Sequence, residues 1–128
     1  MPVILIVDDE SHIRRLLRQS LEEIEETGCE LIEAENGREA LELIEKYKPD
    51  LVLLDVMMSE INGFEVCNTI KNKLKANDIY VIILTAKGQE IDRIKGMECG
   101  ADEYITKPFD PDEIVEKAYK IIKMIKMT

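Results

Sequence analysis

The sequence predicts an α/β domain in which helices cover both faces of one parallel sheet. Three apolar runs have the length of strands and no polar alternation; they cover residues 3–7, 51–54 and 79–84. Such runs are typical of parallel strands that are buried on both faces. Two more mixed segments, residues 30–34 and 103–106, are expected at the edges of the sheet. These edges favour the strand order 2-1-3-4-5, in which the chain reverses direction between the first and third strands.

Segments with apolar residues at helical spacing alternate with the strands and predict five helices. The last helix has the most regular apolar stripe, within an arc of about 120°. Its members are Ile114, Val115, Ala118, Ile121, Ile122 and Ile125. The stripes of the other four helices are Ile13, Leu16, Leu17, Leu21 and Ile24; Ala40, Leu41 and Ile44; Val66, Cys67, Ile70 and Leu74; and Ile91, Ile94 and Met97. The alternation predicts right-handed crossovers and a doubly wound sheet.

The length and composition of the chain indicate one acidic domain, residues 1–128. The formal net charge of −10 disfavours direct binding of nucleic acid, because phosphate contacts require clustered Lys and Arg. No apolar run approaches the ~20 residues of a membrane span, and the residues before the first strand lack the basic and then apolar pattern of a leader. We therefore expect a cytoplasmic protein without membrane insertion. The three cysteines are widely spaced, which favours buried thiols over a disulfide or a zinc site; they are Cys29, Cys67 and Cys99. The single histidine, His12, has no partner at the spacing of metal ligands and is expected on a helix surface.

Polar side chains follow four of the five predicted strands. In chain order they are Asp8, Asp9 and Glu10 after the first strand, Asp55 at the end of the third, Thr85 after the fourth and Lys107 after the fifth. The carboxyl ends of parallel strands meet at one edge of the sheet, where ligands bind at the reversal of direction. The sequence therefore predicts that these residues converge on one crevice.

The converging residues are suited to phosphoryl chemistry with a divalent cation. Mg²⁺ prefers a few carboxylates and often shares phosphate oxygens, so Asp8 and Asp9 are candidate ligands. Asp55 is rigidly held at the end of a buried strand and can attack phosphorus to form an aspartyl phosphate. Lys107 and Thr85 can bind phosphoryl oxygens. Helix capping explains each acid separately, but it does not explain a cation at the end of the fifth strand.

With these residues identified, the sequence resembles the receiver domain of two-component response regulators, in particular the single-domain regulators of chemotaxis. The matching pieces are VDDE (7–10), LLDVMM (53–58), NGFE (62–65), ILTA (83–86) and YITKPF (104–109). They occur in the order of the family and on the expected elements, and the likeness covers the whole chain. The resemblance implies a flavodoxin-like fold with the strand order given above.

The resemblance also implies roles for the acids. Asp55 is expected to be the phosphoacceptor, which receives its phosphoryl group from a phosphohistidine of a sensor histidine kinase. Asp9 and Asp55 are expected to bind Mg²⁺ directly, and Asp8 is expected to act largely through metal-bound water. The main-chain carbonyl of Met57 is expected to be a further ligand. Ser59 stands where the family usually has a proline.

The resemblance further implies a conformational switch. The Thr85 hydroxyl is expected to move towards the phosphoryl group, and the Tyr104 ring is expected to turn inward into the space that Thr85 leaves. Lys107 is expected to contact the phosphoryl group, and the Lys107–Pro108 peptide bond is expected to be cis. The fourth helix, fifth strand and fifth helix are expected to form the output face. Met124 and Met127 lie outside the buried stripe and are expected to contribute apolar contacts to this face.

We therefore expect a response regulator that is activated by phosphorylation and is no turnover enzyme. The output is expected through a downstream protein target or a phosphotransfer protein of a phosphorelay, with the chain a monomer or weak dimer. Because the chain ends soon after the last helix, no attached output domain is expected.

Three alternatives place other functions on the same residues. A Mg²⁺-dependent phosphohydrolase commonly has an acidic general acid two residues after its nucleophile, where this chain has Met57. A nucleotide or flavin binder requires a glycine-rich cradle, which the acidic loop DDESH lacks. A receiver-like binding module without phosphorylation would not need the intact set of acids, threonine and lysine.

Overall fold

A computed structural model of the chain contains one five-stranded parallel sheet with the order β2-β1-β3-β4-β5. The structure describes residues 2–56, 58, 61–76, 78–86 and 99–126. The strands are β1 (Val3–Val7), β2 (Glu30–Ala34), β3 (Leu51–Asp55), β4 (Tyr80–Ala86) and β5 (Glu103–Lys107). The predicted fold class, strand order and edge strands are therefore confirmed.

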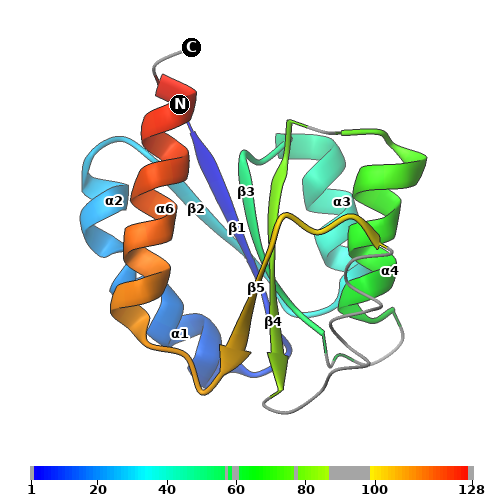
Figure 1. Ribbon diagram of the computed structural model, residues 1–128, viewed down its shortest axis with the longest axis horizontal. Coiled ribbons are helices and arrows are strands. Elements are labelled where there is room, and N and C mark those ends of the chain that lie inside the picture. The colour runs from blue at the N-terminus through cyan, green and yellow to red at the C-terminus, as the bar shows by residue number, and fades with distance from the viewer. Residues whose placement is uncertain (1, 57, 59–60, 77, 87–98, 127–128) are drawn as a thin grey trace.

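Helices lie on both faces of the sheet (Figure 1). One face is covered by α1 (Ser11–Ser20), α2 (Glu22–Glu26) and α6 (Pro111–Lys126). The other is covered by α3 (Gly37–Tyr47), α4 (Gly63–Asn68) and the π-helical turn η1 (Thr69–Lys73), which continues α4. The predicted helix with Ile91, Ile94 and Met97 lies outside the described residues. Among the described helices, none has the length and apolar composition that a membrane span requires.

The central strands β1 and β3 are buried along their whole length, as their apolar sequences predict. Their side chains alternate between two cores. Ile4 and Ile6 pack with α1, α2 and α6, and Leu5 and Val7 pack with α3 and α4. The edge strands β2 and β5 are only partly buried. Asp8, which follows β1, and Asp55, which ends β3, are therefore attached to fully buried strands.

Two leucines of the predicted helical stripes are exposed, and for them the prediction is wrong. Leu16 is 39% exposed because it lies at the margin of its stripe, whereas the adjacent Leu17 is fully buried. Leu74 is 46% exposed. Its N–H bonds to the carbonyl of Thr69, five residues earlier, and this wider turn changes the direction in which later side chains point. The regular stripe of α6 is confirmed at Ile114, Ala118, Ile121 and Ile122, which are buried.

Asparagine side chains cap two helices on the side of α3 and α4. Asn36 accepts a hydrogen bond from the N–H of Glu39 at 2.8 Å, and Asn62 accepts one from Glu65 at 3.0 Å. We expect Asn36→Ala to lower the free energy of unfolding by about 1 kcal/mol, because an N–H of the first turn loses its partner. Asn36→Asp keeps an acceptor and should change stability little. Urea denaturation of both variants would measure this; equal losses would contradict a capping role.

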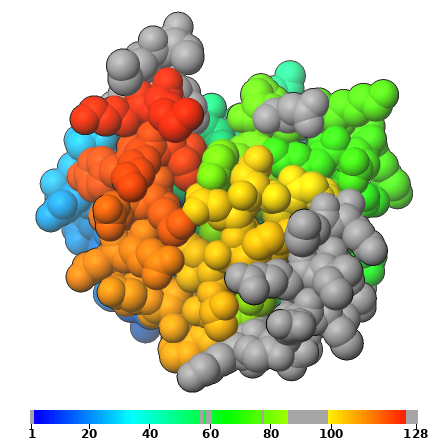
Figure 2. All heavy atoms as spheres, in the orientation of Figure 1, coloured from blue at the N-terminus to red at the C-terminus, as the bar shows by residue number. Residues whose placement is uncertain are grey.

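The surface between α6 and α4 is filled by β5 and the residues just before it, drawn in yellow in Figure 2. One polar network crosses this surface. Glu103 in β5 accepts a hydrogen bond from the Tyr80 hydroxyl of β4 at 2.7 Å and forms an ion pair with Lys117 of α6. Met124 is 68% exposed on α6, as expected for a residue outside the buried stripe. Met127 lies outside the described residues.

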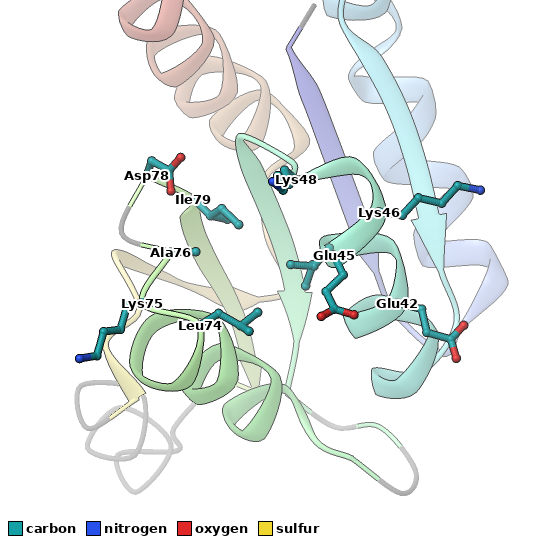
Figure 3. Close-up of a pocket in the computed structure, with 10 residues that line it drawn as sticks. Glu42, Glu45, Lys46, Lys48, Leu74, Lys75, Ala76, Asp78 and Ile79 are labelled. Atoms are coloured by element: carbon teal, nitrogen blue, oxygen red, sulfur yellow. The ribbon is translucent and has the colours of Figure 1, made fainter.

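A groove of about 850 Å³ lies at the opposite end of the sheet, between the end of α3 and the segment that leads from η1 to β4 (Figure 3). Its lining mixes apolar Leu74 and Ile79 with charges of both signs, including Lys48, Lys75 and Asp78. These residues precede the starts of β3 and β4, whereas the predicted site residues lie at the carboxyl ends of the strands or directly after them. The groove is therefore separate from the predicted site.

Candidate functional site

Asp8 and Asp55 lie side by side at the carboxyl edge of the sheet. In the parallel pairing of β1 and β3, Val7 is opposite Leu54, so the next residue of each strand is an aspartate. Asp8 is fully buried and Asp55 is 3% exposed. Two carboxylates are thus held together in a place with little water, which is costly unless a cation accompanies them.

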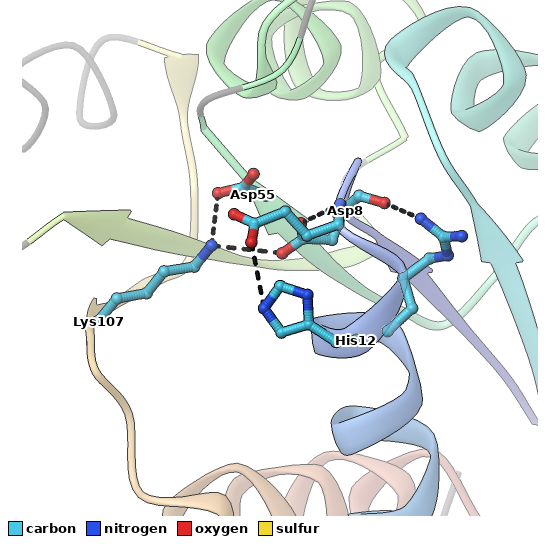
Figure 4. Close-up of polar contacts among 6 residues, drawn as sticks. Asp8, His12, Asp55 and Lys107 are labelled. Atoms are coloured by element: carbon cyan, nitrogen blue, oxygen red, sulfur yellow. Dashed lines mark hydrogen bonds and ion pairs between the residues drawn. The ribbon is translucent and has the colours of Figure 1, made fainter.

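Lys107 supplies one cation from β5, on the far side of β4. Its Nζ lies 2.9 Å from Oδ1 of Asp55 and 3.3 Å from Oδ2 of Asp8 (Figure 4). Side chains alternate along a strand, and Asp55 and Lys107 continue the rows of Leu53 and Ile105 on the face that α1 and α6 cover. The Lys107–Pro108 peptide bond is cis, as expected. The predicted convergence of these three residues is confirmed.

Asp9 and Glu10 are exposed beside the buried Asp8. One carboxylate oxygen from each of the three residues lies within 4.8 Å of the others. The sequence does not indicate which of the adjacent aspartates, Asp8 or Asp9, is buried. In the structure only Asp8 is buried. His12 lies on the surface of α1, where its Nε2 is 3.2 Å from a carboxylate oxygen of Glu10 (Figure 4).

Hydrogen bonds fix Asp8 on all sides. Its N–H donates to the carbonyl of Ala34 at 3.2 Å, and its Oδ1 accepts from the N–H of Glu10 at 3.0 Å. Its own carbonyl accepts from the guanidinium of Arg14 at 2.6 Å. Sequence reasoning missed Arg14, because a backbone acceptor leaves no trace in the pattern of residue types.

Burial has the largest influence on the pKa values of the two buried acids, Asp8 and Asp55. It raises the pKa of Asp55 to about 6; the hydrogen bond from Lys107 opposes this rise, and the charge of Asp8 adds to it. Burial likewise raises the pKa of Asp8. Burial alone would lower the pKa of Lys107, but its hydrogen bond to Asp55 and the two negative charges raise it. The Lys107 ammonium is therefore paired with two buried acids whose pKa values are both raised.

Thr85 and Tyr104 lie on the opposite face of the sheet from Lys107. Ile83 pairs with Tyr104 across β4 and β5, and Thr85 lies two residues beyond Ile83 on the same face. Thr85 is buried, and it follows Leu84, which pairs with Asp55. The Tyr104 hydroxyl is buried and has no hydrogen-bond partner among the described residues. Burial raises the pKa of Tyr104 to about 12.

The donor set of this edge fits Mg²⁺. Hard oxygen ligands and a surplus of negative charge suit this ion, which keeps several waters and binds through one or two carboxylates. Among the described residues, Asp8 and Asp55 share one ammonium, that of Lys107, and Asp9 adds a further carboxylate at the solvent side. Met57, Ser59 and the side chain of Ala86 lie outside the described residues, so the expected carbonyl ligand stays a prediction.

Comparison with known proteins now identifies the family. A family model described as the response regulator receiver domain matches residues 4–119. The chain is a response regulator receiver domain.

Curated relatives of this receiver domain are transcriptional regulators. It is 45% identical over 120 residues to a probable transcriptional regulator, ycf27, of Porphyra purpurea. It is also 45% identical over 120 residues to the phosphate regulon regulator PhoB of Pseudomonas aeruginosa, and 46% identical over 125 residues to ResD of Bacillus subtilis. These matches cover 94%, 94% and 98% of the chain but 47%, 51% and 50% of the relatives. The receiver domain thus spans about half the length of these relatives.

Solved structures of receiver domains have the same fold. The signal receiver domain of a histidine kinase from Syntrophus aciditrophicus superposes with a TM-score of 0.87 at 34% identity, over 100% of this chain and 95% of that one. The receiver domain of the Francisella response regulator 1452 gives a TM-score of 0.84 at 31% identity, over 98% and 99% of the two chains. These similarities extend the family assignment to the whole three-dimensional arrangement.

Proposed function

We propose that this receiver domain is a phosphorylation switch in which Asp55 accepts a phosphoryl group from the phosphohistidine of a sensor histidine kinase. The observation that supports this most directly is the shared Lys107 ammonium between the buried Asp55 and Asp8. This arrangement brings together a nucleophile (Asp55), a neighbouring acid that can bind a metal (Asp8) and a cation that can bind phosphoryl oxygens (Lys107). Mg²⁺ would be held by Asp8, Asp9, Asp55 and the main-chain carbonyl of Met57. Asp8 would act largely through a metal-bound water molecule.

The Asp55 carboxylate performs the transfer. Its pKa of about 6 leaves it ionised near neutral pH. One carboxylate oxygen forms a bond to phosphorus while the bond from phosphorus to the imidazole nitrogen breaks, and the imidazole leaves with the electron pair of that bond. Lys107 moves from the carboxylates to a phosphoryl oxygen as a point charge. When bound, Mg²⁺ neutralises charge on the phosphoryl oxygens and the acids.

The phosphoryl group changes the population of two conformations through Thr85 and Tyr104. Both residues lie on the same face of the sheet, and the Tyr104 hydroxyl lacks a hydrogen-bond partner among the described residues. An unpartnered buried hydroxyl costs free energy, which reduces the free-energy difference to another position of the ring in which the hydroxyl is hydrogen-bonded. The Thr85 hydroxyl donates to the phosphoryl group in the active state.

The output of the switch is contact with a protein. The transcriptional regulators it resembles are about twice its length, so the phosphorylated surface acts on a downstream protein, on another part of a longer chain or on the next carrier of a phosphorelay. In each case the domain catalyses its own phosphorylation and dephosphorylation and turns over no independent substrate. The rival phosphohydrolase would instead show multiple turnover of a small phosphomonoester.

Incubation with acetyl phosphate and Mg²⁺, followed by intact mass measurement, tests the proposal. We expect the mass of a single phosphoryl group on the protein, dependent on Mg²⁺ and absent in Asp55→Asn, because the amide cannot act as the nucleophile. Asp78→Asn is the matched control, since Asp78 is exposed and lies at the opposite end of the sheet. Persistent labelling of Asp55→Asn would place the phosphoacceptor elsewhere.

A further inference from the structure

Arg14 of α1 reaches back to the loop that carries the acids. Its Nη1 donates to the main-chain carbonyl of Asp8 at 2.6 Å, and its Nε lies 3.4 Å from Oε1 of Glu33 in β2. The Arg14 side chain is only 16% exposed. The planar guanidinium is therefore oriented by two partners, one on each side.

The hydrogen bond from Arg14 is made to the peptide that joins the two aspartates. The N–H and the carboxylate of Asp8 are held by other groups, so its carbonyl is the remaining main-chain contact that sets the plane of the Asp8–Asp9 peptide. That plane determines the direction in which the Asp9 side chain leaves the chain. Asp9 is exposed, and no hydrogen bond joins its carboxylate to another described residue. Its position thus depends on the backbone.

We propose that Arg14 is a positioning residue for the Mg²⁺ site, which acts by fixing the Asp8–Asp9 peptide and does not touch the ion. This inference rests on the proposed function. Groups behind the ligands of a metal orient them, and their loss commonly weakens metal binding. The charge of Arg14 has the opposite effect, because a nearby cation repels Mg²⁺. Positioning and charge therefore predict changes of opposite sign when Arg14 is replaced.

Arg18 provides a matched control on the same helix. It lies four residues after Arg14 and pairs with the same Glu33 at 2.8 Å and with Glu25 at 3.5 Å. Within the described part of the chain, it forms no hydrogen bond or ion pair with Asp8. Replacing either arginine by methionine removes one positive charge and retains an unbranched apolar stem. Only the Arg14 substitution removes the donor to the Asp8 carbonyl.

Titration of the full chain with MgCl₂ in a calorimeter, without a phosphoryl donor, tests the inference. We expect Arg14→Met to weaken Mg²⁺ binding about 10-fold, and Arg18→Met to leave it unchanged or slightly tighter. Arg14→Gln, whose side chain is too short to span both partners, is expected to behave like Arg14→Met and serves if the methionine variant does not fold.

Affinity equal to or tighter than wild type in a folded Arg14 variant would overturn the inference, because charge or stability alone would then describe the residue. A similar loss in Arg18→Met would overturn it as well. Failure of the proposed function gives a different result, since the wild-type domain would then bind no Mg²⁺ at all.

Discussion

Gly63→Ala is expected to lower the free energy of unfolding by about 3 kcal/mol and to slow phosphorylation of Asp55 by acetyl phosphate. Gly63 begins α4 and packs directly against the end of β3. A Cβ built at Gly63 would lie 2.3 Å from the carbonyl oxygen of Asp55 and 2.9 Å from the Cα of Val56. Both atoms belong to the backbone of a buried segment, so neither can rotate away, and the strain falls on the residue that carries the nucleophile.

Urea denaturation and the rate of phosphorylation measure the two effects. Glu65→Ala is the control, because it places the same methyl group on the same helix at an exposed position. That variant should lose only the small stabilisation of an acid in the first helical turn, about 0.5 kcal/mol. Gly63→Ala with wild-type stability and an unchanged rate would show that α4 can move away from β3 at no cost.

Asp55→Asn is expected to stabilise the metal-free domain by about 2 kcal/mol near neutral pH. The folded state raises the pKa of Asp55 to about 6, above its ordinary value of about 3.9. As pH rises between these values, the unfolded chain releases its proton first, so wild-type stability falls across this window and then levels off. Asparagine carries no charge and escapes this loss, although Lys107 then keeps only Asp8 as a partner.

Denaturation of both proteins across this pH range, without Mg²⁺, measures the difference. The advantage of Asp55→Asn should shrink as pH falls below about 6 and vanish near about 4, where the wild-type carboxyl is protonated in both states. Adding Mg²⁺ should stabilise the wild type more than the variant, because the variant lacks one ligand. A variant that is less stable than wild type near neutral pH would mean that the ion pair with Lys107 outweighs the burial of Asp55.

The arrangement of the sheet could be predicted because burial on both faces restricts the composition of whole strands. Residues 3–7 and 51–54 have no polar position, so they could only be central strands, and their ends then had to meet. The convergence of Asp8, Asp55 and Lys107 follows from strand order together with the alternation of side chains, which puts all three on one face of the sheet. Leu16 and Leu74 were assigned wrongly, because a helical period says nothing about where a stripe ends or where a wider turn changes its phase.

Other properties of the site depend on contacts that residue types do not encode. Adjacent identical acids give no sign that Asp8 is buried and Asp9 exposed; that difference arises when the carboxylate of Asp8 binds the N–H of Glu10 and the ammonium of Lys107. The role inferred for Arg14 depends on a carbonyl that every residue possesses. Family resemblance supplied the expected roles of Tyr104 and Met57, which spacing alone did not indicate.

The contacts of Glu103 have a mechanical consequence. This residue begins β5, the strand that ends in Lys107, and it joins Tyr80 at the start of β4 to Lys117 in the middle of α6. We therefore expect a displacement of the Lys107 end of β5 to be transmitted to α6 through Glu103. A partner protein that binds both β5 and α6 would then detect a change in the orientation of the two elements together.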